Sequence, residues 1–422
     1  MDCPNPKRRS AAAAVPSLPE DAILDILERV PARSIHRFKC VSRRWIDLIS
    51  DPAHRKRFPQ TLEGFFCSDA DDCYSGKFIR LPGMRAPLFD PSLSSLTKLP
   101  GNKNIVLLNS CGGLLLFGHG AVGGIDAELG YIVCNPATEQ WLAVDSAGCP
   151  APEDCAPTYI IFDPAVSPHF HLIHLWQDST IGMIEVRIYS SETGLWVNCP
   201  RISMRTHEDE LDDWEQWCKG GPASMGNTFV NGKLHFIIFQ RDTRSYLIAG
   251  LDWEGNLDTL RYIIWPDMYV SSAIFLGQSQ GHLYCMSGYQ EGNGFYHCGI
   301  SIWVLQDYNK EEWVLKHSVT FFKLFGQKKL RVHVDYNVIG MHPDCNWIFL
   351  VHHCNRKLIA YDMDSKKVHT LGTIKHSYRH YAPYIPYYSE LSVLGANRQR
   401  VLEFDLRPPG VEKLATWVAR LH

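Results

Sequence analysis

The feature that most constrains the fold of this 422-residue chain is a recurring phrase: an apolar strand-like run, a polar turn, and then Trp or an apolar substitute. Copies occur at residues 133–141, 188–196, 251–257, 305–313 and 360–368. Trp141 lies about 55 residues before Trp196. The same interval of about 55 residues separates Trp313 from Val368. A unit of this size that recurs at a fixed interval predicts a repeat architecture.

From about residue 61 onward, short runs of Val, Ile, Leu, Phe, Tyr and Trp alternate with Gly, Pro, Asn and Asp turns, which is the all-β pattern. An interval near 55 residues matches one four-stranded blade of a kelch-like β-propeller. Because one blade cannot bury both of its faces, blades stack around an axis until the ring closes. Residues 61–406 have room for about six blades, so we expect six, with five or seven left open. Residues 61–100 and 390–406 would form the last blade together.

The segment before the repeats, residues 17–52, has helical periodicity instead. The apolar residues at helical spacing in its first part are Ile23, Leu24, Ile26, Leu27 and Val30. A second short helix is expected around Ile35, and a third from about residue 41 to residue 49, carrying Trp45. A module of about 40 residues buries too little surface to be stable comfortably on its own. Part of its apolar stripe is therefore expected to meet a partner.

Charge is unevenly distributed over this helical module. Lys and Arg dominate from Arg29 to Arg57, whereas the first helix is acidic. A basic surface beside apolar residues would also suit a helix-turn-helix on DNA. We disfavour DNA because apolar and aromatic residues dominate the module and the whole chain has a formal net charge of only −3. We expect a protein partner and no nucleic acid.

These residues resemble the F-box in its plant form. The matching positions are Leu18-Pro19-Glu20-Asp21, Ile23-Leu24, Ile26-Leu27, Arg29-Val30-Pro31, Ser34-Ile35, Arg37-Phe38, Val41-Ser42, Trp45 and Leu48-Ile49. Ala22, where a larger aliphatic residue is usual, and Ser42, where many members carry Cys, depart from the pattern. The resemblance implies a three-helix module that binds the Skp adaptor of a cullin–RING ubiquitin ligase.

The same resemblance implies which residues would touch the Skp adaptor. They are Leu18, Pro19, Ile23, Leu27, Ile35, Val41 and Trp45. The alternative is that several of them, Leu27 and Val41 especially, pack the core of the module itself. Later stretches resemble the F-box-associated region of plant F-box proteins, of a type abundant in grasses. These stretches are residues 110–116, 134–138, 162–164, 301–305 and 384–390.

The expected organisation follows from both resemblances. We expect a disordered tail at residues 1–16, an F-box domain at 17–60, a propeller at 61–406 and a C-terminal helix at 407–422. Such a chain would be the substrate-recognition subunit of an SCF-type (Skp–cullin–F-box) ubiquitin ligase, with no catalytic residue and no cofactor of its own. Its contribution would be proximity between target and conjugating enzyme. A non-degradative F-box scaffold, and a propeller that is a small-ligand receptor or enzyme, remain open alternatives.

Composition bears on the compartment. The 14 Cys are scattered without a Cys-x-x-Cys pair, and no Asn-x-Ser/Thr sequon occurs, so we expect reduced thiols in the cytosol or nucleus. No apolar run is long enough for a membrane helix, so no membrane span is expected. The basic cluster Lys7-Arg8-Arg9 is only weak support for nuclear import.

Two patterns imitate small-ligand sites. Residues 118–123 read G-x-G-x-x-G, but a strand rather than a helix is expected to follow, so we interpret them as a hairpin loop. A second pattern is a group of possible zinc ligands, namely His342, Cys345, His352, His353, Cys354, His376 and His380. A zinc site needs four convergent ligands, usually in close pairs, and the spacing offers no second pair. We expect no metal site, and no G-x-S-x-G or similar phrase marks a nucleophile.

Residues 207–217 form an acidic, Trp-containing insertion within the β region. Six of the eight residues from 208 to 215 are Asp or Glu. A solvated loop is the simpler interpretation. The alternative is a loop that contacts the target, in which acidic charge steers a basic partner and Trp anchors it. The candidate target-binding residues are Glu208, Asp209, Trp214 and Trp217.

Overall fold

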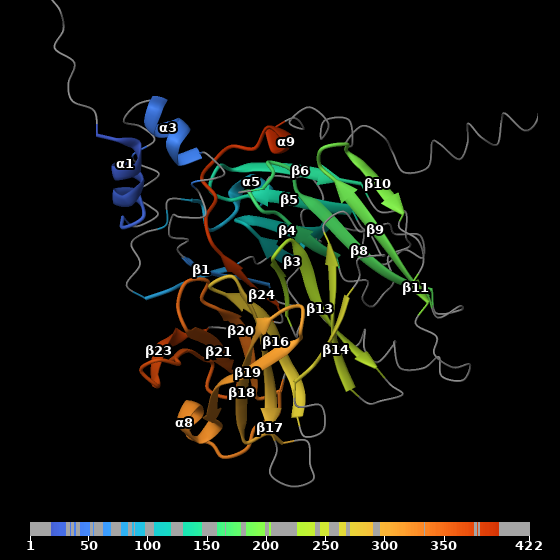
Figure 1. The fold of residues 1–422 in the computed structure, drawn as a ribbon, viewed down its shortest axis with the longest axis vertical. Coiled ribbons are helices and arrows are strands. Elements are labelled where there is room, and N and C mark those ends of the chain that lie inside the picture. Colours follow the sequence, from blue (N-terminus) through green and yellow to red (C-terminus); the bar gives the residue numbers. More distant parts are fainter. Residues whose placement is uncertain are drawn as a thin grey trace, which may run out of the picture. The chain divides into compact units, whose positions relative to one another are not determined.

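The computed structural model divides the chain into two compact units, residues 1–59 and residues 60–422 (Figure 1). The residues that it describes are 18–30, 34, 38, 43–50, 54, 62–68, 77–82, 87, 89–97, 105–119, 130–145, 158–164, 166–178, 183–198, 202–203, 226–240, 245–252, 261–266, 271–289, 296–332, 334–374, 378 and 380–395. The predicted tail at residues 1–16 and the predicted C-terminal helix at 407–422 lie outside them.

The first unit contains helices where the apolar periodicity predicts them. Helix α1 (Glu20–Leu27) begins directly after Pro19, whose carbonyl accepts the N–H of Ile23 at 3.2 Å. Helix α3 (Arg43–Ser50) corresponds to the third expected helix. Ser34 and Phe38, which are described individually, are also helical. Helices therefore make up most of the described part of the first unit.

One apolar cluster holds the first unit together. Its buried members come from α1 and α3 and are Ile23, Leu24, Leu27, Leu48 and Ile49. Val30, Phe38 and Trp45 pack against this cluster, and the rings of Phe38 and Trp45 meet edge to face at 5.2 Å. The apolar stripes of the two helices thus face each other.

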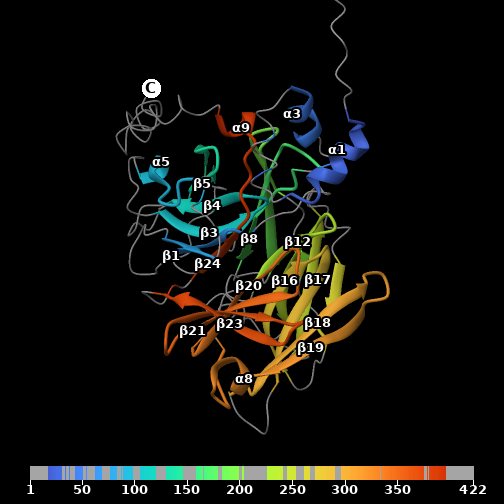
Figure 2. The same ribbon diagram turned by 90° about the vertical axis from the view of Figure 1, so that its left-hand side faces the viewer.

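The second unit consists of six antiparallel sheets, which are the blades of a propeller (Figures 1 and 2). Blade 1 contains β1 (Gly64–Ser68), β2 (Lys77–Arg80) and β24 (His380–Tyr384). Blade 2 contains β3 (Ile105–Cys111), β4 (Leu114–His119), β5 (Gly130–Asn135) and β6 (Gln140–Val144). Blade 3 contains β7 (Thr158–Ile161), β8 (His171–Asp178), β9 (Met183–Ser190), β10 (Leu195–Asn198) and the short β11 (Ile202–Ser203). The prediction of six blades is confirmed.

The remaining three blades follow in chain order. Blade 4 contains β12 (Asn227–Val230), β13 (Lys233–Gln240), β14 (Ser245–Asp252) and β15 (Arg261–Ile264). Blade 5 contains β16 (Ser271–Ser279), β17 (His282–Tyr289), β18 (Gly299–Asp307) and β19 (Glu312–Thr320). Blade 6 contains β20 (Tyr336–Met341), β21 (Trp347–His352), β22 (Lys357–Asp362) and β23 (Lys367–Thr373). Short helices α5 (Ser94–Thr97), α8 (Phe321–Phe325) and α9 (Ser392–Gly395) lie between or after the blades.

Blade 1 closes the ring by joining distant parts of the chain. Its strand order is β2-β1-β24 among the described residues, and Phe66 of β1 pairs with Ala382 of β24. The expectation that residues 390–406 supply this strand is wrong for residues 390–395, because the strand lies at 380–384 and residues 392–395 form α9; residues 396–406 lie outside the described part. The tail after β24 instead packs between blades 2 and 3 through Tyr387, Leu391 and Leu394.

Two local contacts fix this tail against blade 2. The side chain of Asn135 donates to the carbonyl of Tyr387 at 2.8 Å. Gly113 has a φ of 91°, and a Cβ at this position would lie 2.5 Å from the Cβ of Tyr387. Glycine is therefore required at residue 113 both by the backbone conformation and by the close approach of the tail.

Six apolar clusters lie between the six pairs of neighbouring blades, one cluster at each interface. The middle strands contribute to two clusters at once, because successive side chains point to opposite faces. In β21, Ile348 and Leu350 face blade 5, whereas Phe349 and Val351 face blade 1. This burial on both faces explains why such strands appear in the sequence as continuous apolar runs.

The recurring phrase that predicted the blades has two structural causes. The residue before the outer strands of blades 2, 3, 5 and 6 adopts a left-handed conformation at Glu139, Gly194, Glu311 and Lys366, with φ of 56°, 72°, 56° and 57°. In blades 3 and 5 the Trp that follows then reaches the preceding blade. The indole N–H of Trp196 donates to the carbonyl of Asp145 at 3.0 Å. That of Trp313 donates to the carbonyl of Ile264 at 3.1 Å.

Two histidines are buried inside the propeller in their neutral form. His174 hydrogen-bonds through Nδ1 to the hydroxyls of Tyr131, at 3.0 Å, and Thr158, at 2.9 Å. His235 contacts the hydroxyl of Tyr308 through Nε2 at 3.0 Å. Burial lowers the pKa of each imidazole from 6.5 to about 4. Both side chains therefore resist protonation in the folded state.

The aromatic packing of blade 1 should be essential to stability. The ring of Phe66 lies 4.9 Å from that of Phe78 and 5.1 Å from that of Tyr384. We expect Phe66→Ala to lower the free energy of unfolding of the full chain by about 3–5 kcal/mol in chemical denaturation. The control is Phe322→Ala, the same change at an exposed position, which should cost less than about 0.5 kcal/mol. Similar losses in both variants would contradict the role given to blade 1.

The buried histidines should make the propeller acid-sensitive. Between about pH 6.5 and 4 the unfolded state binds more protons than the folded state, so stability is complete above this window and is lost as pH falls through it. The loss should approach about 3 kcal/mol per histidine. Denaturation midpoints at pH 7.5 and 5.0 should differ less in His174→Gln/His235→Gln than in wild type. His282→Gln, at an exposed hairpin, is the control, and equal pH dependence in all three proteins would exclude this mechanism.

Candidate functional site

The predicted adaptor contacts of the first unit fall into two groups. Leu18 is 55% exposed, and Pro19 is exposed beside it at the start of α1. Ile23 and Leu27 are instead buried in the cluster between α1 and α3, and Trp45 is half-buried against Phe38. The predicted contacts Ile35 and Val41 lie outside the described residues. Leu18 and Pro19 are therefore the predicted contacts that present apolar surface.

One exposed apolar residue was absent from the predicted contacts. Ile26 on α1 is 47% exposed. Its signal in the sequence is its spacing of four residues from Ala22, which puts both on one face of the helix, just after the exposed Leu18 and Pro19. Ala22 is half-buried. We call Leu18, Pro19, Ala22 and Ile26 the α1 docking surface.

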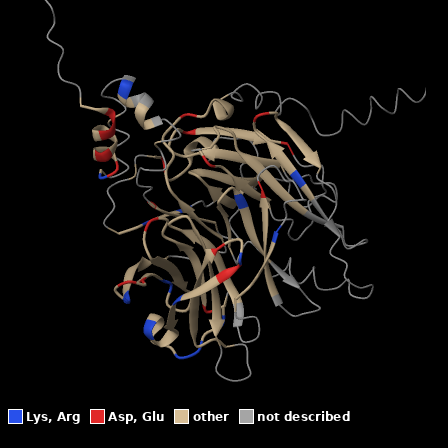
Figure 3. Cartoon of the chain, viewed as in Figure 1, with Lys and Arg blue, Asp and Glu red and all other residues tan. Residues whose placement is uncertain are grey.

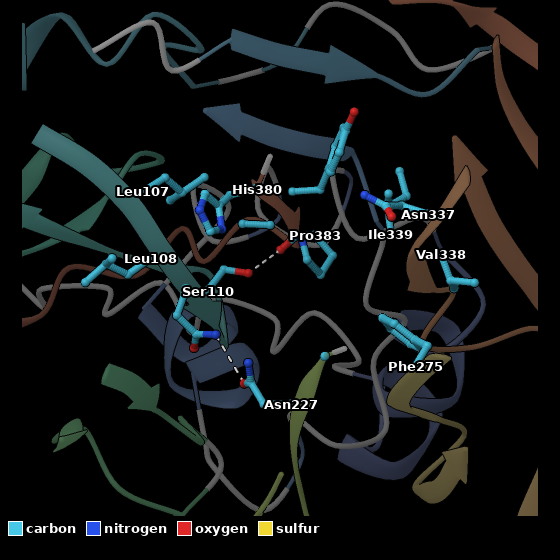
Figure 4. A pocket seen from close by; sticks show the side chains of 14 residues that line it. Leu107, Leu108, Ser110, Asn227, Phe275, Asn337, Val338, Ile339, His380 and Pro383 are labelled. Atoms are coloured by element: carbon cyan, nitrogen blue, oxygen red, sulfur yellow. Dashed lines mark hydrogen bonds between the residues drawn. The ribbon is translucent and has the colours of Figure 1, made fainter. Parts of the chain in front are cut away.

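The second candidate site is a cavity of about 110 Å³ at the centre of the propeller (Figure 4). Inner strands of five blades line it, namely β3, β12, β16, β20 and β24. The lining residues are Leu107, Leu108, Asn109, Ser110, Gly226, Asn227, Phe275, Asn337, Val338, Ile339, His380, Tyr381, Ala382 and Pro383. This volume corresponds to about three or four water molecules.

The polar groups of the cavity bind the inner strands to one another. The side chain of Asn109 donates to Asn227 Oδ1 at 3.1 Å and accepts from the backbone N–H of Ile160 at 3.2 Å, so it joins blades 2, 3 and 4 (Figure 4). Ser110 donates to the carbonyl of Pro383 in blade 1 at 2.8 Å. The described lining residues include His380 and Tyr381 but no carboxylate, thiol, Lys or Arg. The hydrogen bonds of Asn109 and Ser110 align the inner strands with one another.

The possible zinc ligands do not converge. Cys345 precedes β21, whereas His353 and Cys354 follow it, and a six-residue strand separates its ends by about 20 Å. His352 is buried at the end of β21 and stacks on Phe325 at 4.8 Å. Burial raises the pKa of the Cys345 thiol to about 11, which disfavours the thiolate that a metal requires. Among the described residues no group of three or more His, Cys, Asp or Glu could hold a metal ion; His376 lies outside them.

The G-x-G-x-x-G pattern begins in β4, at Gly118, and its flanking strands are adjacent in one sheet. Gly118 of β4 pairs with Tyr131 of the antiparallel strand β5. A dinucleotide fingerprint instead needs a helix after the glycines, so that its N-terminus can hold the pyrophosphate. The flanking strands therefore agree with a hairpin; residues 120–129 between them lie outside the described part.

The predicted target-binding residues Glu208, Asp209, Trp214 and Trp217 lie outside the described residues, but both ends of their segment are placed. Ser203 ends β11 on the outer side of blade 3, and Asn227 begins the inner strand β12 of blade 4. In a blade of four antiparallel strands the outer strand ends on the side of the ring where the next inner strand begins, so the connectors after blades 3 and 5 emerge on one face of the ring. We call it the connector face.

Comparison with known proteins agrees with this architecture. Residues 79–385 match the family described as F-box protein At3g26010-like, beta-propeller, and residues 15–57 match the F-box domain. F-box protein At5g07610 of Arabidopsis thaliana is 26% identical over 336 residues, which cover 74% of this chain and 72% of that protein. F-box protein At5g49610 of the same plant is 23% identical, covering 85% and 92% respectively. The description of the matched family names a β-propeller without specifying kelch repeats, so the kelch type of the blades stays a prediction.

Solved structures add little to this comparison. A prolyl endopeptidase chain aligns with a TM-score of 0.39 and 9% identity, covering 76% of this chain and 40% of that one. Such a distant likeness carries no argument about activity. Among the described helices, none is long and apolar enough to cross a membrane.

An F-box joined to a propeller is the organisation of substrate adaptors of SCF-type ubiquitin ligases. The family match covers most of the chain, from the first blade to the closing strand β24. This protein therefore belongs to the F-box protein At3g26010-like β-propeller family.

Proposed function

We propose that this protein is the substrate-recognition subunit of an SCF-type ubiquitin ligase. The F-box unit docks on a Skp-type adaptor, and the propeller holds a target protein for ubiquitination. The observation that carries the proposal is the match to the F-box at residues 15–57 in the same chain as a propeller of F-box proteins at 79–385. The ligase works in the cytosol or nucleus, and its chemistry belongs to other subunits.

The α1 docking surface supports the first half of the proposal. Leu18, Pro19 and Ile26 expose apolar surface that the first unit does not bury itself. Ile23 and Leu27 hold α1 against α3, so they position this surface by packing. Exposed aliphatic side chains on a short, fixed helix are suited to bury against a partner. Ile35, Val41 and Trp45 remain proposed contacts.

The second half of the proposal is supported by the hydrogen bonds that hold the inner strands of the propeller together. Asn109 and Ser110 join neighbouring blades in this way. A bound target would gain reactivity only through effective concentration near the conjugating enzyme. The acidic segment with Trp214 and Trp217, which the sequence places between β11 and β12, is the proposed target contact.

Removing the α1 docking surface should weaken adaptor binding without unfolding the chain. We expect Leu18→Ala/Ile26→Ala to raise the Kd for a purified plant Skp-type adaptor by about tenfold or more, because each lost apolar contact is worth about 1 kcal/mol. Biolayer interferometry with the full chain provides the measurement. Val166→Ala/Leu315→Ala, which truncates equally exposed residues of the propeller, is the control.

Further variants distinguish residues that touch the adaptor from residues that pack the core of the F-box unit. Leu27→Ala should abolish hydrogen-exchange protection of α1 together with adaptor binding, whereas Leu18→Ala/Ile26→Ala should retain that protection, because Leu27 is fully buried. Wild-type protein that fails to bind the adaptor would refute the proposed function.

Target capture should depend on the acidic segment. Proximity labelling under proteasome inhibition identifies the target. The Trp214→Ala/Trp217→Ala variant should then recover about tenfold less target, because interface Trp residues often dominate binding energy. Adaptor binding should remain unchanged in the same variant. A longer target half-life without this protein would distinguish a ligase from a scaffold. Unchanged target recovery in the Trp variant would exclude this segment.

A further inference from the structure

The connector between blades 5 and 6 exposes apolar side chains that the fold does not need. Residues 321–335 join β19 to β20 and begin with α8. Phe322 on α8 is 63% exposed, and Val334 near the end of the connector is 53% exposed. Tyr296, from the loop between β17 and β18, is 50% exposed on the same connector face. The loop of Tyr296 adjoins the connector, because His297 pairs with Leu330. Several exposed apolar residues on adjoining segments indicate an interaction surface more strongly than a single one does.

The backbone that carries these side chains is fixed. Thr320 caps α8 by accepting the N–H of Lys323 at 3.3 Å, and Gly326 ends the helix with a φ of 74°. Phe321 and Leu324 anchor α8 in the cluster between blades 5 and 6. Further along, backbone hydrogen bonds of 2.8 Å and 3.0 Å pair His297 with Leu330. The exposed residues are thus presented on a rigid support, which reduces the entropic cost of binding.

Positive charge accompanies the apolar residues. Lys323, Lys328 and Lys329 are exposed on the connector, and no described carboxylate lies within ion-pair distance of them. Arg331 differs, because it pairs with Asp335 at 3.2 Å and the guanidinium lowers the pKa of that carboxyl. Figure 3 shows basic residues on α8 and along the chain that follows it. The connector therefore carries three basic groups without a described acidic partner.

We propose that this basic, aromatic connector binds an acidic segment of the target protein that contains an aromatic or aliphatic anchor. We call its residues Tyr296, Phe322, Lys323, Lys328, Lys329 and Val334 the connector ridge. Charge complementarity selects the acidic partner: the lysines steer it and fix its register, while Phe322 offers an apolar contact. This inference rests on the proposed function, because it takes the partner to be the ligase target.

A nucleic acid fits the ridge less well. Non-specific binding to nucleic acid depends on the number of phosphates neutralised, and three lysines beside three exposed apolar residues form a small footprint. The chain as a whole has a formal net charge of −3, which repels a polyanion. An acidic peptide segment needs opposite charge only at the ridge itself, so the net charge of the chain does not oppose its binding.

The first experiment uses a defined probe. A fluorescein-labelled peptide with the sequence of residues 207–217, HEDELDDWEQW, has the required acidic and aromatic composition. Full-length protein should bind it in fluorescence anisotropy, and Lys328→Glu/Lys329→Glu should weaken binding by about tenfold or more. Phe322→Ala should weaken it by about fivefold. The control Lys366→Glu/Lys367→Glu reverses two exposed lysines on the blade 6 hairpin and should leave binding unchanged.

Several outcomes would overturn the proposal. Equal peptide affinity in wild type and Lys328→Glu/Lys329→Glu is one, and tighter binding of a single-stranded DNA oligonucleotide than of the peptide is another. The third outcome is a gain of about tenfold in peptide affinity when residues 207–217 of the chain are replaced by Gly and Ser. Such a gain would mean that this segment, and not a target protein, occupies the ridge. Unchanged thermal unfolding of each variant shows that the fold is intact.

A second experiment separates this inference from the proposed function. Lys328→Glu/Lys329→Glu should bind the Skp-type adaptor as wild type does but should recover about tenfold less target after proximity labelling. Normal adaptor binding with normal target recovery would reject the ridge and leave the proposed function standing. Failure of the wild-type protein to bind the adaptor would reject the proposed function itself.

Discussion

The pairing of β1 with β24 is the constraint on which the rest of the propeller depends. Phe66 of β1 and Ala382 of β24 are register partners although more than half of the chain separates them. Without this pairing, the clusters on both sides of blade 1 would be open to water. Since every blade buries its two faces only against its neighbours, an opening at one interface weakens the whole ring. Closure therefore makes the six clusters one cooperative structure.

Closure also determines what the centre of the ring can do. The inner strands approach one another closely enough for the side chain of Asn109 to bridge three blades and for Ser110 to bond the backbone of blade 1. Polar side chains that are committed to neighbouring strands are poorly placed to act on a substrate. The small cavity between them follows from the geometry of closure. The contacts that we propose for the adaptor lie on the surface of the protein.

The sequence predicted the features that depend on interactions between residues close together in the chain. Six blades follow from one interval because the same local features return: a left-handed turn residue in four of the copies, as at Gly194, and a Trp hydrogen bond to the preceding blade at Trp196 and Trp313. The closing strand could not be located, because residues 380–384 contain Pro383 and lack the phrase. Helical periodicity likewise cannot separate Leu27, which packs the core, from Ile26, which is exposed beside it. Such distinctions depend on partners distant in the sequence.

The same constraints indicate where recognition must reside. The apolar faces of the middle strands are used by the blade interfaces, as Phe349 and Leu350 illustrate, so they are not available to a partner. Two connectors between blades, at residues 204–226 and 321–335, carry opposite charge; the first is rich in Trp, and the second exposes Phe322 and Val334. A target that engages both must present a basic and an acidic element at once, and this requirement makes recognition more selective than either connector would be by itself.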